Sequence, residues 1–444
     1  MGTMPVGRLI ITMAWPAMLS MIIQAMYNIV DSFFVSMVGE EALAAVTYVF
    51  PIQMVMISTI IGTGVGINSL ISRRLGARRF EEANLAASHG YRLAFFGWAF
   101  FALVGLFLSE PLMKVMTDTP YIVQNGAIYL SIVLTGSLFI FVQITSEKIL
   151  QATGNMIFPM LCSITGGVTN IVFDPLLIFG IGPFPEMGVT GAAVATVIGQ
   201  LFSMILGQLL LFKGNHPVKV SIRGWKWNWQ ICKDIYAVGA PAILMQCIAS
   251  VLQFCMNLIL SGFTETAVAV NGVYGRLQSF IFMPCFGLNQ GVLPIMGYNY
   301  GARNKKRLMD TYKKGIFLAL GIMTCGLIVF QIFPAQLIGI FNSTGSDEML
   351  DIGVHAFRAL SCCFIPAAFG ILSGALFQAT GHGFLSLFGS LIRQLFGVLP
   401  LAILFAEFCG LNMVWWSFPL AEIIGTLYFA IIAKRLYDRE LKHL

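Results

Sequence analysis

The sequence Gly-Ala-Arg at residues 76–78 returns at residues 301–303, which is 225 positions later. The sequence Gln-Ala-Thr-Gly at residues 151–154 returns at residues 378–381, which is 227 positions later. Two matches at nearly one offset indicate that the chain is one unit written twice. In a membrane protein, such a duplication is typical of a transporter with a central site between two halves that move against each other.

The composition places the chain in a membrane. Hydrophobic residues make up 57% of it and charged residues only 10%, with a mean hydropathy of +0.83. A soluble domain carries about 25% charged residues. The apolar runs are about twenty residues or longer, which is the length that crosses lipid as a helix and twice that of a barrel strand. The predicted fold class is therefore an all-α polytopic membrane protein.

Turn sequences divide the chain into twelve predicted membrane spans. They use nearly the whole chain and leave no room for a soluble catalytic domain. No GxxxxGK[ST] sequence is present, which argues against direct ATP drive. The predicted spans are 9–36, 42–72, 88–109, 121–149, 156–180, 188–212, 235–261, 267–297, 315–338, 350–378, 385–406 and 411–433.

The basic residues predict the orientation. Most of the 26 Lys and Arg residues fall on one side if the N-terminus is cytoplasmic. Each half has an even number of spans, so the two six-helix lobes are predicted to be parallel and both termini to be cytoplasmic. The predicted lobes are residues 1–212 and 234–444, around a central cavity. The basic linker 213–233 is predicted to lie on the inner leaflet, anchored by its three tryptophans, Trp225, Trp227 and Trp229.

One acid lies within the first span. A charge at mid-bilayer costs about 2.5–3.5 kcal/mol even on the lenient insertion scale, so it calls for a specific explanation. Asp31, Asn28 and Gln24 have helical spacing and share one face, which we expect to point into protein or a water-filled cavity. Pro16, about four turns earlier, removes a backbone hydrogen bond and favours a kink. The alternative is that Asp31 faces solvent at the outer helix end.

The fifth span carries Asn170 and Asp174, one helical turn apart and directly before Pro175. With Asp31 they offer carboxylate and amide oxygens, which suit Na⁺, while a partly buried carboxylate also carries H⁺. The sequence does not choose between these ions, so a metal site at these three residues is predicted only for Na⁺ coupling. In the alternative, Asn170 and Asp174 merely satisfy each other. Thr196 in the sixth span adds a hydroxyl or bonds back to its own helix.

The second half lacks these acids. The positions that correspond to Asp31 and Asp174 are Met256 and Leu401, so the ion chemistry is predicted in the first half alone. Eight polar side chains of both halves are predicted to line the central cavity, namely Gln24, Asn28, Gln53, Gln246, Gln253, Asn257, Gln278 and Arg276.

Two further embedded acids have local explanations. Glu147 stands beside Lys148, which favours an interfacial ion pair. Glu422 is predicted either to face the cavity or to pair with Arg393 or Arg276.

The chain resembles the multidrug and toxic compound extrusion (MATE) family along essentially its whole length. The resemblance rests on the two Gly-Ala-Arg segments, on the Asp31 helix, on Gln-Ala-Thr-Gly-Asn at 151–155 and on the segment 170–175. It implies a branch in which the first lobe holds the coupling site. The first-helix acid of that branch matches Asp31 and its kink proline matches Pro16. Its remaining site residues match Asn170, Asp174 and Thr196.

The resemblance implies export of amphipathic, mostly cationic, drugs in exchange for H⁺ or Na⁺, across the plasma membrane. The Lys and Arg residues are not interleaved with aromatic residues on an exposed domain, so we expect no nucleic-acid partner. We also expect no cofactor beyond the coupling ion, and a monomer in the bilayer. The alternative is a lipid-linked oligosaccharide flippase of the related superfamily, which would use arginines to hold a pyrophosphate. An intramembrane enzyme is disfavoured, because no HExxH or GxGD sequence appears.

Overall fold

Ten long apolar helices, and two bent helix pairs, are the candidate membrane spans of the described residues. The computed structural model describes residues 1–214, 216–221, 227–341 and 346–444, so Trp225 lies outside the described residues. If each bent pair counts as one span, up to twelve spans result. The described residues hold helices and no strands, which confirms the predicted all-α class.

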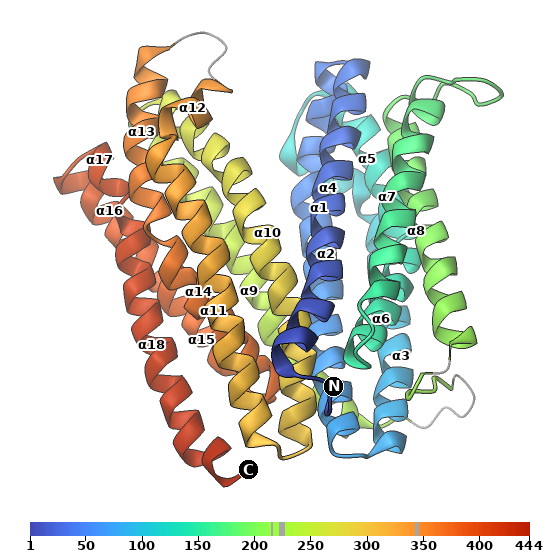
Figure 1. Cartoon of the computed structure of the whole chain (residues 1–444). Coiled ribbons are helices and arrows are strands. Elements are labelled where there is room, and N and C mark those ends of the chain that lie inside the picture. Colours follow the sequence, from blue (N-terminus) through green and yellow to red (C-terminus); the bar gives the residue numbers. More distant parts are fainter. Residues whose placement is uncertain (215, 222–226, 342–345) are drawn as a thin grey trace. The chain divides into compact units, whose positions relative to one another are not determined.

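The chain divides into two compact units of helices, shown in Figure 1. One comprises residues 19–239, here the 19–239 unit. The other comprises residues 240–444 together with residues 1–18, here the 240–444 unit. These units differ from the predicted lobes, because the start of the first helix joins the second half and the linker joins the first.

The 19–239 unit contains most of α1 and all of the next seven helices. Their bounds are α1 (Val6–Val38), α2 (Glu40–Gly76), α3 (Phe80–Phe107), α4 (Ser109–Met116), α5 (Pro120–Thr135), α6 (Leu138–Ala152), α7 (Ile157–Ile178) and α8 (Val189–Lys213).

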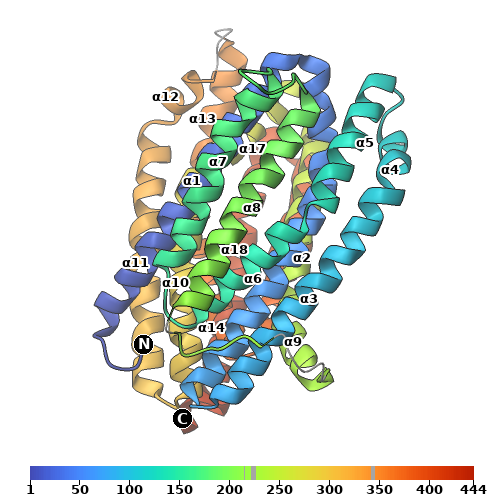
Figure 2. The same cartoon turned by 90° about the vertical axis from the view of Figure 1, so that its right-hand side faces the viewer.

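The 240–444 unit holds α9 from residue 240 onward and all of the later helices, and its N- and C-termini lie at the same end (Figures 1 and 2). The bounds are α9 (Trp229–Ser261), α10 (Glu265–Gly301), α11 (Lys305–Ile332), α12 (Pro334–Gly339), α13 (Asp347–Ser361), α14 (Phe364–Ala379), α15 (Gly383–Arg393), the π-helix η1 (Gln394–Val398), α16 (Leu399–Phe408), α17 (Leu411–Val414), α18 (Ser417–Arg439) and the 3₁₀-helix η2 (Leu441–His443).

The duplication is visible in the backbone of the helix ends. Arg78 and Arg303, at matching positions, are the described non-glycine residues with positive φ, at 58° and 54°. Each follows a helix whose last carbonyls are satisfied by the same set of backbone hydrogen bonds. Gly154 and Gly381 match equally closely, at 92° and 93°. The two halves therefore use the same turns at the predicted offsets.

The bent spans also repeat. The α5–α6 pair bends by 44° and the α13–α14 pair by 43°. The first begins at Pro120 and the second at Asp347, 227 positions later. Each half thus interrupts its fourth span at the corresponding place.

The linker packs on protein. The backbone amides of Lys219, Ser221 and Asn228 donate to side chains of α3, namely Asn84 Oδ1 at 2.7 Å, Ser88 Oγ at 3.2 Å and His89 Nε2 at 3.0 Å. Trp227 lies against the rings of His89 and Phe96. The Trp227 ring is therefore held by aromatic contacts within the 19–239 unit, and the position of the linker on the inner leaflet stays a prediction.

The strained arginine turn yields a stability prediction. A non-glycine residue at positive φ costs about 1–2 kcal/mol. We expect Arg78→Gly to raise the thermal unfolding temperature in detergent, by an amount that corresponds to about 0.5–1 kcal/mol after the entropy cost of glycine. Arg79→Gly is the matched control, since Arg79 has a φ of −93° and gains no such relief. An equal or lower unfolding temperature for Arg78→Gly would contradict the strain argument.

Candidate cation site

Asn170 and Asp174 form a buried pair on α7. Their side chains are 3% and 0% exposed. Asn170 Nδ2 donates to Asp174 Oδ1 at 3.2 Å, as their spacing of one turn predicts. This bond uses one oxygen and leaves Asp174 Oδ2 and Asn170 Oδ1 buried without a hydrogen-bond partner. The mutual satisfaction considered as an alternative is therefore only partial.

Helix α8 packs closely beside α7, as Figure 2 shows. A Cβ on Gly199 of α8 would lie 2.8 Å from the carbonyl oxygen of Gly166 and 3.3 Å from Asn170 Cβ. Only glycine fits such a close helix crossing. The glycine brings α8, and with it Thr196, up to the Asn170 level of α7.

Asp31 of α1 is the second carboxyl of this site. Its Oδ1 is buried and has no hydrogen-bond partner. It lies close enough to Asp174 for the two carboxyls to interact electrostatically. The structure thus brings together Asp31, Asn170 and Asp174, which are far apart in sequence, within the 19–239 unit.

Tyr129 of α5 joins the site and was missed from the sequence. Its phenol lies beside the side chains of Gln53 and Thr196, and it lies within electrostatic range of both aspartates. The signal in the sequence was weak. A tyrosine in an apolar span needs a partner for its hydroxyl, but the span does not say which partner. The Thr196 hydroxyl donates back to Ala192 O at 3.0 Å, which is the local role considered for this residue, and its role in the cation site stays a prediction.

The arrangement suits a small cation. Two buried carboxyls in electrostatic contact do not both ionise without a compensating positive charge. One shared proton supplies that charge. A sodium ion supplies it equally, since carboxylate and amide oxygens are its preferred type of ligand. Three unpartnered oxygens, on Asp31, Asn170 and Asp174, are available to either ion.

The predicted cavity residues fall on different units. Gln24 and Asn28 lie exposed on α1 of the 19–239 unit. Gln246 and Gln253 lie exposed on α9 of the 240–444 unit, with Asn257 half-buried beside them. Asn271 Nδ2 donates to Asn257 Oδ1 at 2.9 Å, and Gln253 Nε2 donates to it at 3.4 Å. Amides on exposed helix faces at membrane depth are expensive in lipid, which favours contact with water or substrate.

The other charged side chains within the membrane spans have different hydrogen-bond partners in the two halves. Glu147 accepts a hydrogen bond from Gln143 at 3.0 Å, and Lys148 donates to Gln151 at 3.0 Å. In the 240–444 unit, Arg393 Nη1 donates to Glu422 Oε1 at 2.9 Å, which is one of the two pairings considered from the sequence. Within the 19–239 unit, Glu147 and Asp31 both lie within electrostatic range of Tyr27 on α1.

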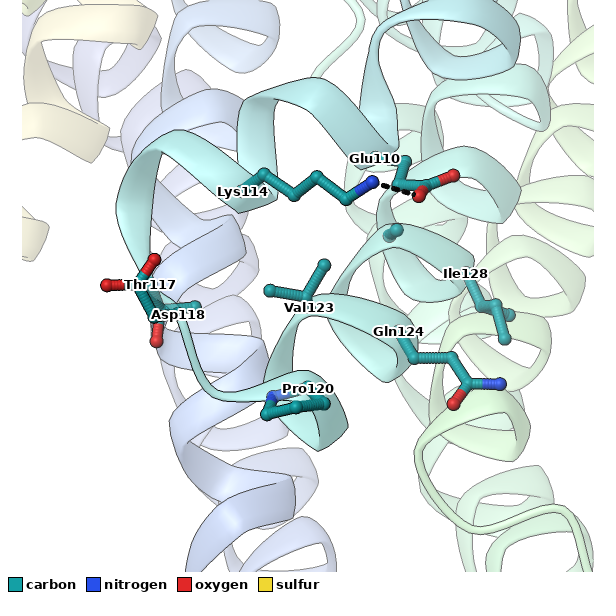
Figure 3. A pocket seen from close by; sticks show the side chains of 9 residues that line it. Glu110, Lys114, Thr117, Asp118, Pro120, Val123, Gln124 and Ile128 are labelled. Atoms are coloured by element: carbon teal, nitrogen blue, oxygen red, sulfur yellow. Dashed lines mark ion pairs between the residues drawn. The ribbon is translucent and has the colours of Figure 1, made fainter.

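A pocket of about 640 Å³ opens beside α4 and α5, away from these residues (Figure 3). Its charged pair is Lys114 and Glu110, whose Nζ and Oε1 are 2.6 Å apart. The Lys114 ammonium lowers the pKa of the Glu110 carboxyl by donating a hydrogen bond to it. Both side chains are more than half exposed and satisfy each other. The pocket therefore lacks the unpartnered buried groups that distinguish the Asp31 site.

The model of the MatE family matches residues 16–176 and, separately, residues 241–404. The chain belongs to the MatE family. The two matches begin 225 positions apart, at the offset that the sequence repeats predict. The predicted MATE resemblance and the twelve-span fold class are confirmed. MatE proteins are transporters, which fits a chain that consists of membrane spans almost throughout.

Known MatE relatives cover nearly the whole chain. A FAD transporter of Shewanella oneidensis is 26% identical over 441 residues, which is 98% of this chain and 96% of the relative. Multidrug export protein MepA of Staphylococcus aureus is 24% identical over 438 residues, 98% of this chain and 95% of the relative. An outward-facing structure of a multidrug resistance MATE family transporter is 28% identical with a TM-score of 0.91, covering 98% of this chain and 97% of that one.

Proposed function

We propose that this MatE protein is a secondary active multidrug exporter, which exchanges H⁺ or Na⁺ for amphipathic, mostly cationic, drugs. The observation that carries the proposal is the pair of interacting carboxyls, Asp31 and Asp174, with unpartnered buried oxygens. The similarity to multidrug export protein MepA supports the drug class. The proposed protein is a monomer in the plasma membrane with both termini in the cytoplasm.

The proposed mechanism is alternating access between the two halves around a central cavity. A cationic drug enters from the cytoplasm while Asp31 and Asp174 are free of the coupling ion. The ion then arrives from outside, neutralises the site and weakens its attraction for the cationic drug. This supplies the difference in affinity between two states that an exchange cycle requires. Pro16 is the proposed bending point, because the boundary between the compact units falls within one turn of it, at Met18.

The test is efflux of a fluorescent lipophilic cation, such as ethidium, from proteoliposomes. A pH gradient and a Na⁺ gradient are imposed separately. Export under the pH gradient alone identifies H⁺ as the coupling ion, and export under the Na⁺ gradient alone identifies Na⁺. Failure of export under both gradients would refute the drug-exporter proposal and favour the flippase alternative.

One observation favours a second candidate, export of an anionic dinucleotide. Arg276 lies exposed within α10 and has no ion pair or hydrogen bond within the described part of the chain. An unpaired guanidinium suits a phosphate, and one relative is described as a FAD transporter. We expect Arg276→Gln to reduce FAD flux in proteoliposomes and to leave ethidium efflux unchanged. FAD flux that is absent from the unsubstituted protein would exclude this candidate.

A further inference from the structure

A partly buried ion pair lies in the second half, at a place that the proposed coupling mechanism does not use. Arg393 ends α15, and Glu422 lies on α18, with side chains 20% and 13% exposed. Burying such a pair is favourable only when the geometry is good, and removing one partner leaves a costly lone charge. The π-helix η1 begins directly after Arg393, and π-helical turns are frequent at functional sites.

Helix contacts fix which residues correspond between the halves. In the 19–239 unit, Ser203 Oγ donates to Cys162 O at 2.7 Å, and Gly199 packs on Gly166. In the 240–444 unit, the corresponding residues lie 226 or 227 positions later and are again in contact. Gly389 and Phe429 correspond to Cys162 and Ser203, and Arg393 and Gly425 correspond to Gly166 and Gly199. A Cβ on Gly389 would meet the ring of Phe429, and a Cβ on Gly425 would lie 3.1 Å from Arg393 Cβ.

This register assigns counterparts to the ion pair. Because Gly199 corresponds to Gly425 at an offset of 226, Thr196 corresponds to Glu422 at the same offset. Arg393 corresponds to Gly166, one turn before Asn170. The second half therefore places an acid where the first half has the hydroxyl of its candidate cation site, and it places a fixed cation beside that acid.

The surroundings resemble an ion site rather than a fully satisfied salt bridge. Arg393 Nε, Gln394 Oε1 and Tyr274 OH are buried and have no hydrogen-bond partner. The titratable groups within electrostatic range of Glu422 are Arg393, Tyr274 of α10 and Cys363 at the α13–α14 bend. Within the part of the chain that the structure describes, Arg393 is the one group near Glu422 that carries a positive charge, so its guanidinium compensates the carboxylate.

We propose that Arg393 is a resident cation, which fills the second-half counterpart of the site where the first half takes a mobile cation. The comparison with a mobile cation rests on the proposed function of Asp31 and Asp174. In consequence, the duplicated scaffold exchanges an ion in one half only. Replacing Arg393 by a neutral residue opens a second site, at which Glu422 takes up a proton from the medium.

The test uses the full chain in lipid nanodiscs and infrared difference spectra between acidic and alkaline buffer. The readout is the carbonyl absorption of protonated carboxyl groups. We expect Arg393→Gln to gain the signal of one carboxyl, and the double variant Arg393→Gln/Glu422→Gln to lack this gain. Arg393→Lys is the matched control, because it keeps a cation and is expected to gain nothing. A spectrum of Arg393→Gln equal to that of the unsubstituted protein, or a gain in Arg393→Lys, would overturn the proposal.

Thermal unfolding covers the case in which Arg393→Gln folds poorly. If Arg393 serves to neutralise Glu422, adding Glu422→Gln restores the unfolding temperature lost in the single variant. A double variant as unstable as the single variant would refute the proposal. These readouts need no transported drug. The proposed function has a separate readout in the same spectra. It predicts that the unsubstituted protein shows a titrating carboxyl signal that Asp31→Asn lacks, and it fails if the two spectra are equal.

Discussion

Asp31→Asn is expected to reduce ion-driven drug efflux at least tenfold, to the level of empty proteoliposomes. Asparagine matches the size of a protonated aspartate, but it neither releases a proton nor offers a negative charge to Na⁺ or to a cationic drug. Coupling between two ligands is typically about 1–3 kcal/mol, which is about 5- to 150-fold in affinity. Replacing Asp31 removes one carboxyl of the interacting pair, so Asp174 is left without the second carboxyl with which it interacts. We expect the coupling between ion binding and drug binding to be lost with it.

The measurement is ethidium efflux under the pH gradient and, separately, under the Na⁺ gradient. The matched control is Asp351→Asn, because the Asp351 side chain is 83% exposed at the start of α13 and lies outside the 19–239 unit. We expect the control to export like the unsubstituted protein. Efflux at the unsubstituted rate by Asp31→Asn, with an equal amount of folded protein, would remove Asp31 from the coupling site.

Local signals in the sequence predicted local features of the fold. The repeated Gly-Ala-Arg and Gln-Ala-Thr-Gly segments correspond to turns with nearly identical φ in both halves, because helix ends depend on a few neighbouring residues. The one-turn spacing of Asn170 and Asp174 predicted their hydrogen bond for the same reason. Helical periodicity needs no knowledge of the partner helix.

Features that depend on contacts between helices were beyond the sequence. Tyr129 reaches Thr196 and Gln53 only because three different helices meet there. The choice between Arg393 and Arg276 as partner of Glu422 likewise depends on how α15 packs on α18. The division of α1 at Met18 depends on where two glycines of α10 leave space for it. Such pairings depend on how side chains of two different helices fit together, and they produce no periodic pattern in the sequence.

The contact between Gly287 of α10 and the start of α1 predicts the largest loss of stability. A Cβ on Gly287 of α10 would lie 2.7 Å from the backbone nitrogen and from the Cα of Met18. Backbone atoms do not swing aside as a flexible side chain does, so the helices must separate. Overpacking of this kind costs about 1–3 kcal/mol. We therefore expect Gly287→Ala to lower the unfolding temperature in detergent and the yield of folded protein.

Gly275→Ala is the matched control for Gly287→Ala. Gly275 lies in the same helix, and a Cβ there would meet nothing within 4 Å. We expect this variant to gain about 0.5–1 kcal/mol, because alanine loses less backbone entropy in a helix than glycine does. Opposite shifts in two variants that add the same methyl group to one helix can come only from the contact with α1. If the unfolding temperature shifts in the same direction in both variants, α1 does not pack against Gly287. The assignment of residues 1–18 to the 240–444 unit then loses its physical basis.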